Sequence, residues 1–121
     1  MSGKIDLPNS KATAHWWIIK ENTDINSGHY APGGHMAALF QDELYEMVHG
    51  NAGYARLQSF GVVFGGERVV IYVEPKNGKA QMVGANTSRS QLLIENEPLH
   101  WPDFASEFRA HMPDELAAYQ D

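Results

Sequence analysis

The chain has 121 residues, of which 43% are hydrophobic and 20% are charged, and it contains no cysteine. This length predicts one domain with a single core, and the lack of cysteine excludes disulfides, thiolate metal sites and cysteine nucleophiles. The 9 basic and 15 acidic residues give a formal net charge of −6, which argues against direct nucleic-acid binding because that binding depends on Lys and Arg. No apolar run approaches the roughly 20 residues of a membrane span and no secretory signal is recognisable, so we expect a cytoplasmic protein without membrane contact.

The first third of the chain predicts a tail, a strand, a loop and a helix. Residues 1–14 lack apolar periodicity and are expected to form a flexible tail, followed by a single globular domain over residues 15–121. The apolar run from His15 to Lys20 favours a buried strand, and residues 21–34 have the composition of a loop. Apolar residues at steps of three and four predict a helix over residues 35–49.

The rest of the chain predicts two hairpins and two helices. The β-branched runs at 60–64 and 68–73 flank a Gly-Gly turn and indicate a hairpin, whose nearly all-apolar second strand is expected to be central. A short hairpin is expected over residues 91–100. Pro102 suits the first turn of a helix, and Pro113 separates it from a final short helix. These elements predict an α+β fold: one domain with a small, mostly antiparallel sheet packed against two or three helices.

Three early histidines, His15, His29 and His35, would suit zinc if the fold brought them together. No local His-x-His or His-x3-His spacing forces that convergence, so the sequence favours ordinary loop and strand-end histidines and predicts neither metal nor cofactor. The stretch from Tyr30 to His35 places a glycine pair before the predicted helix, where backbone N–H groups would face an anion. Glycines that simply turn the chain explain the same pair and are the preferred interpretation.

Acidic residues concentrate at the C-terminal end. Asp103, Glu107 and His111 share one face of the predicted helix at four-residue spacing, which fits either a metal site or, as we prefer, a solvated face. Residues 102–121 supply −4 of the net charge, because they contain five acidic residues against Arg109 alone. This concentration predicts a patch suited to a basic groove on a partner.

Adjacent tryptophans mark a further candidate surface. Trp16 and Trp17 must point to opposite faces of a strand, so one enters the core while the other is either covered by a helix or exposed. An exposed tryptophan is typical of an interaction surface. Residues 100–102 are expected to staple the last helix to the sheet, and Trp101 is also a binding candidate.

Four stretches of the chain resemble a region of uncharacterised bacterial histidine-kinase-like, or GHKL-type, ATPase proteins. The Asn-x-Ser-Arg core of Asn86, Ser88 and Arg89 is also similar to a loop in the middle domain of the ninety-kilodalton heat-shock chaperones, where the arginine helps to sense the nucleotide phosphate. The chain has no Asn-box glutamate and no Asp-x-Gly-x-Gly motif. The resemblance therefore implies an accessory part that acts on an ATPase partner through Arg89. The four stretches are residues 30–47, 68–75, 86–92 and 98–104.

Together these patterns predict a small acidic protein of bacterial or phage type that binds another protein without enzymatic activity. Such an interaction or regulatory module would inhibit or assist a larger nucleic-acid- or nucleotide-handling partner, and a homo-oligomer stays open. The alternative is a small metal- or phosphate-binding enzyme built on His15, His29 and His35. No catalytic residue is predicted. The candidate binding residues are Trp17, Tyr30, His35, Arg89, Trp101, Asp103, Glu107, Asp114 and Glu115.

Overall fold

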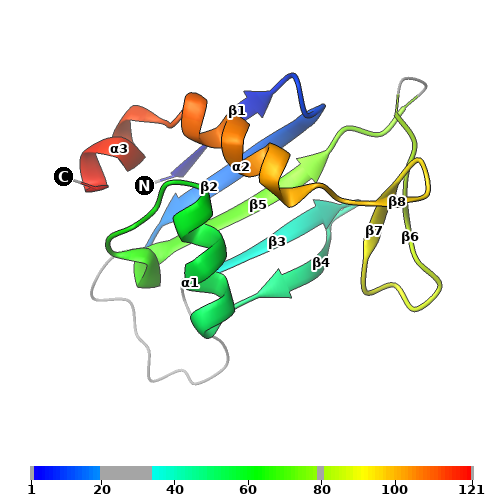
Figure 1. Ribbon diagram of the computed structural model, residues 1–121, viewed down its shortest axis with the longest axis horizontal. Coiled ribbons are helices and arrows are strands. Elements are labelled where there is room, and N and C mark those ends of the chain that lie inside the picture. The colour runs from blue at the N-terminus through cyan, green and yellow to red at the C-terminus, as the bar shows by residue number, and fades with distance from the viewer. Residues whose placement is uncertain (1, 20–33, 79–80, 121) are drawn as a thin grey trace.

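Five strands form the main sheet of the protein (Figure 1). The computed structural model describes residues 2–19, 34–78 and 81–120. The spatial order of the strands is β1-β2-β5-β3-β4. Neighbouring strands are antiparallel, except that β3 and β5 are parallel. The strands are β1 (Ser2–Leu7), β2 (Ala12–Ile18), β3 (His35–Phe40), β4 (Glu43–Val48) and β5 (Val69–Pro75).

The helices lie on one face of this sheet (Figure 1), and we call the opposite side, which exposes Trp17 but buries His35 and Val70, the open face. A smaller antiparallel sheet, in the order β6-β7-β8, lies beyond the β4 edge. The protein is therefore of the α+β class that the sequence predicts. No helix among the described residues is long and apolar enough to cross a membrane. The remaining elements are α1 (Gly50–Ser59), η2 (Gly66–Arg68, a 3-10 turn), β6 (Val83–Ala85), β7 (Leu92–Ile94), β8 (Glu97–Pro98), α2 (Trp101–Ala110) and α3 (Asp114–Gln120).

The core lies between the helices and the sheet. Side chains alternate along β2, so that Trp16 is fully buried while Trp17 is 37% exposed on the open face. Trp16 and Ile71 of the sheet belong to one apolar cluster with Leu57 of α1 and Phe108 of α2. This burial supplies the main driving force that holds the helical layer on the strands.

Several predicted elements are confirmed. The apolar run after His15 lies mostly in β2, and β5 is a central strand that ends at Pro75. The hairpin predicted over residues 91–100 is formed by β7 and β8. α2 has Pro102 in its first turn, and α3 begins directly after Pro113.

The helix predicted over residues 35–49 is wrong, because this segment is the β3–β4 hairpin. Gln41 and Asp42 both have positive φ, 52° and 65°, and form a tight turn of the kind that joins antiparallel strands. The true helix, α1, begins at Gly50, directly after the predicted one ends. Gly53 permits this, since a Cβ there would collide with the carbonyl oxygen of Gly34.

Two other predictions are also wrong. The flexible tail predicted over residues 1–14 instead contains β1, paired with β2 along its whole length. The run at 60–64 is not a strand: Phe60 and Val62 are buried under the helices, whereas Val63 and Phe64 are exposed. β5 completes the sheet by pairing with β2 and β3 instead of with that run. The loop predicted over residues 21–34 lies, except for residue 34, outside the described residues.

Candidate binding groove

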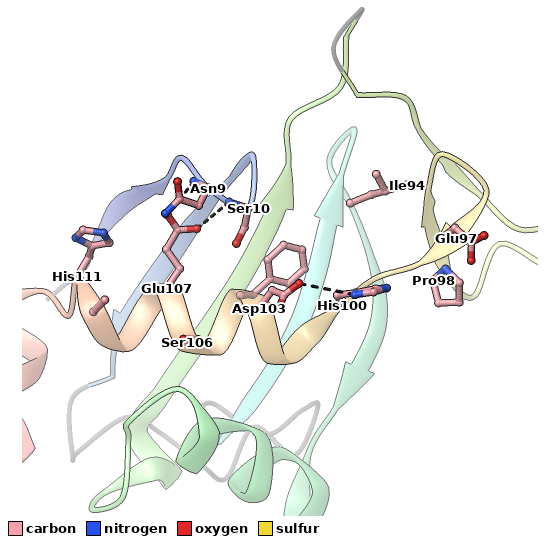
Figure 2. Close-up of a pocket in the computed structure, with 12 residues that line it drawn as sticks. Asn9, Ser10, Ile94, Glu97, Pro98, His100, Asp103, Ser106, Glu107 and His111 are labelled. Carbon is pink, nitrogen blue, oxygen red and sulfur yellow. Dashed lines mark hydrogen bonds and ion pairs between the residues drawn. The ribbon is translucent and has the colours of Figure 1, made fainter.

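A groove of about 580 Å³ runs along α2, between the turn that joins β1 to β2 and the chain around β8 (Figure 2). Its apolar surface comes from Phe104 and Ala110 of α2 and from Ile94 and Pro98 of the smaller sheet. Among the described residues, its polar lining contains three carboxylates and two histidines but neither Lys nor Arg. The polar lining residues are Asn9, Ser10, Glu97, His100, Asp103, Ser106, Glu107 and His111.

The face of α2 that lines the groove is set by the side chains that the same helix buries. Phe104 and Phe108 are buried against the core, and this fixes the rotation of the helix. Asp103, Glu107 and His111 consequently follow one another along the groove, as their four-residue spacing predicts. Among the described residues, however, no group of three His, Asp or Glu side chains is arranged to hold a metal ion.

Glu107 is not a solvated carboxylate, which corrects the prediction for this residue. It is only 7% exposed, and its two oxygens accept the backbone N–H groups of Asn9, at 2.9 Å, and Ser10, at 2.8 Å. Burial raises the pKa of Glu107, but these hydrogen bonds and the neighbouring His111 outweigh it and hold the pKa below its usual value. Glu107 therefore stays ionised and positions the β1–β2 turn, which forms one wall of the groove.

Asp103 and Glu97 supply the exposed negative charge. The side chain of Asp103 is 74% exposed and lies 3.7 Å from the ring of His100, a separation at which a protonated histidine is attracted. Glu97, in β8, is exposed on the other side of the groove (Figure 2). The guanidinium of Arg109, on the same helix, is directed to α1, where it donates a hydrogen bond to the carbonyl of Ser59. The groove is thus acidic along its exposed rim.

The predicted α3 carboxylates lie outside the groove. Asp114 and Glu115 are exposed in the first turn of α3, and neither lines the groove. They add negative charge at the C-terminal end of the helical layer. The acidic patch predicted from composition is therefore divided into a concave part on α2 and an exposed part on α3.

Trp101 is partly exposed and holds the start of α2 in place. It packs against Phe60 and Phe104, and the guanidinium of Arg56 lies 4.3 Å from its ring centre. Its Nε1 donates to Glu46 at 3.1 Å. Burial lowers the pKa of Arg56, and the charge of Glu46 partly offsets that shift. This network confirms the stapling that the sequence predicts for Trp101.

Sequence reasoning missed Glu46, which joins three elements. Glu46 has a φ of 55° and lies where the β3–β4 register shifts. Its backbone N–H donates to the carbonyl of Ser90, and its carboxylate accepts the N–H of Leu92 as well as the indole of Trp101. A charged residue within an amphipathic pattern gives no sequence signal for this role, because its partners are 44 to 55 residues further along the chain.

Arg89 does not line the groove and lies on the loop between β6 and β7. Asn86 organises this loop by accepting the backbone N–H groups of Ser90 and Gln91. Arg89 has a φ of 58° and forms an exposed ion pair with Glu43, at 2.9 Å. Its hydrogen bond, with that of Tyr45, lowers the pKa of Glu43. Arg89 is thus exposed but already engaged by a carboxylate.

The open face brings together two of the three early histidines. His15 bonds to Glu74 at 2.9 Å, and His35 bonds to the hydroxyl of Tyr72, also at 2.9 Å. Trp17 packs between these pairs, stacked near His15 and edge-on to Tyr72, with ring centres 5.1 Å apart in the latter contact. His35 begins a strand and not a helix, so the alternative of an anion site at a helix start there is wrong. His29 and Tyr30 lie outside the described residues.

Comparison with known proteins gives no neighbour for this chain: no family model, curated protein or solved structure matches it. The groove and the open face must be interpreted from their own geometry.

Proposed function

We propose that the protein is a non-enzymatic interaction module that binds a basic segment of a partner protein in the α2 groove. The observation that carries this proposal is the lining of the groove, in which an apolar floor lies beside the exposed carboxylates of Glu97 and Asp103, with no Lys or Arg among the described residues. Lys and Arg side chains have aliphatic stems and charged heads. A basic segment would therefore satisfy both parts of the lining.

The charge distribution supports the same partner chemistry. The chain carries a net charge of −6, and Asp114 and Glu115 extend the negative surface beyond the groove. A surface of one sign increases the association rate with a partner of the opposite sign. Proteins that handle nucleic acid or nucleotides have basic surfaces of this opposite sign. By occupying such a surface, the module would inhibit or assist the partner.

The rigidity of the groove also favours binding. Glu107 fixes the β1–β2 turn through two hydrogen bonds, and Trp101 fixes the start of α2. A preformed wall loses little conformational entropy when a ligand binds. The buried carboxylate is held ionised by its own chain, so its role in this proposal is structural.

The test is affinity purification from the native host with two charge-matched variants. Glu97→Lys/Asp103→Lys reverses the rim of the groove, and Asp114→Lys/Glu115→Lys makes the same charge change outside it. We expect a stoichiometric partner that binds the wild type and the α3 variant but not the groove variant. Equal loss from both variants, or no partner at moderate salt, would contradict the proposal.

One observation supports the alternative of a small ligand-binding enzyme. His15 and His35 share the open face around Tyr72, although the described residues alone supply no three-ligand metal group. Metal analysis of tag-free protein tests this alternative. Zinc or iron near one equivalent would favour it, and below about 0.1 equivalent would remove its metal form, because such sites bind tightly.

A further inference from the structure

The two edges of the main sheet are treated differently by the fold. At the β4 edge, Glu46 introduces a register shift, and the loop before β7 covers the strand through the hydrogen bond from Glu46 to Ser90. An ion pair from Arg89 to Glu43 closes the same edge. Bulges and covering segments are the usual ways in which proteins prevent a sheet edge from pairing with another chain.

The β1 edge has neither device. β1 pairs with β2 in an unbroken register from Ser2 opposite Trp17 to Leu7 opposite Ala12, and it contains no proline. Among the described residues, no backbone hydrogen bond from a segment other than β2 reaches residues 2–6. Its outer side therefore presents unpaired backbone N–H and C=O groups, which form a template for an additional strand.

The side chains of β1 select the partner for that edge. Lys4 and Asp6 are exposed on the open face, and Ile5 between them packs partly against the core. If a second β1 pairs antiparallel with Ile5 opposite Ile5, each Lys4 lies opposite an Asp6 of the other copy. Opposite charges directly across two strands stabilise their pairing. The sequence of this strand is thus complementary to itself in charge.

We propose that two copies of this chain dimerise through antiparallel pairing of their β1 strands, centred on Ile5. The two five-stranded sheets would join into one continuous sheet, and the two-fold symmetry closes the assembly at two copies. Asp6 already contacts Lys76 of its own chain at 2.7 Å, and its second oxygen is available to a second cation. This proposal is independent of the function of the α2 groove.

Charge reversal on β1 tests the dimer and its register together. The probe is the tag-free protein, with its mass in solution measured by light scattering and by sedimentation at concentrations up to about 100 µM, where a micromolar dimer is populated. We expect the wild type to be a dimer. Lys4→Asp and Asp6→Lys should each weaken dimerisation about tenfold or more, because both cross-strand pairs become repulsive.

Mixing the two variants provides the decisive step. In Lys4→Asp both charged residues of β1 are acidic, and in Asp6→Lys both are basic. An equimolar mixture should therefore restore a dimer that contains one copy of each variant. Glu115→Lys, which makes on α3 the same charge change as Asp6→Lys, should dimerise like the wild type. Circular dichroism verifies that each variant is folded. A monomeric wild type, an undiminished single variant or a monomeric mixture would overturn the proposal.

Discussion

Replacing Glu107 by glutamine tests the physical account of the groove. The carboxylate accepts two backbone N–H groups, at 2.9 Å and 2.8 Å, from Asn9 and Ser10. Glutamine has one carbonyl oxygen, so its NH2 group would face a backbone donor. A hydrogen bond to a charged group contributes about 1.5–3 kcal/mol to stability. We expect Glu107→Gln to reduce the free energy of unfolding by about that amount at pH 7.

Urea denaturation monitored by tryptophan fluorescence measures this change. For a small protein, the free energy of unfolding falls by about 1–3 kcal/mol per molar urea. The expected loss therefore lowers the urea concentration at the unfolding midpoint by about 1 M. The matched control is Asp103→Asn, on the same face of α2 but 74% exposed. The stability of this variant should change little, because the ion pair of Asp103 with His100 is long, at 3.7 Å, and exposed.

The pH dependence gives the sharper criterion. The pKa of Glu107 is lower in the folded protein than its ordinary value of 4.5. The stability that the ionised Glu107 contributes is therefore fully present when the pH is above that ordinary value. It is lost as the pH falls through the pKa of the folded protein. The difference in stability between wild type and Glu107→Gln should be constant from pH 7 to about pH 5 and then shrink. A difference that is absent at pH 7, or equal at pH 7 and pH 3, would refute the reasoning.

Three further substitutions probe the supporting structure. Trp101→Phe keeps the ring packing but removes the hydrogen bond to Glu46, so thermal unfolding should show a loss of about 1 kcal/mol. Gly53→Ala forces a Cβ against the Gly34 carbonyl, and calorimetry should show a loss of about 1–3 kcal/mol or a failure to fold. Arg89→Ala should raise the pKa of the carboxylate with which it pairs, as seen by NMR titration, while the urea midpoint stays unchanged. If the chain serves an ATPase, the same variant should abolish ATPase coupling; intact coupling would remove that role.

The sequence predicts the elements whose signals are local. Pro102 and Pro113 delimit α2 and α3, and the apolar run of β5 is long enough to indicate a central strand. The β3–β4 hairpin was missed because Met36, Leu39 and Phe40 satisfy a helical spacing as well as a strand. The decisive feature is the pair of positive φ angles at the turn, and Gln-Asp is not a strong signal for it.

The candidate site could be predicted only in part for a similar reason. Spacing correctly places Asp103 and Glu107 on one face of a helix. It cannot show that Glu107 is buried, because its hydrogen-bond partners, Asn9 and Ser10, are nearly a hundred residues earlier in the chain. The sequence places Trp16 and Trp17 on opposite faces of a strand. That Trp17 is the exposed one follows only from the structure, in which the helices cover a single face of the sheet.

The bond between Glu107 and the β1–β2 turn also has a consequence for biosynthesis. The first hairpin leaves the ribosome long before Glu107 is translated, so its turn lacks these acceptors during most of synthesis. Contacts at such sequence separation form late and slow the folding of a domain. Until α2 packs on the sheet, the apolar side of this hairpin is exposed to neighbouring nascent chains. The dependence of the nascent chain on chaperones should therefore fall sharply once α2 has emerged from the ribosome.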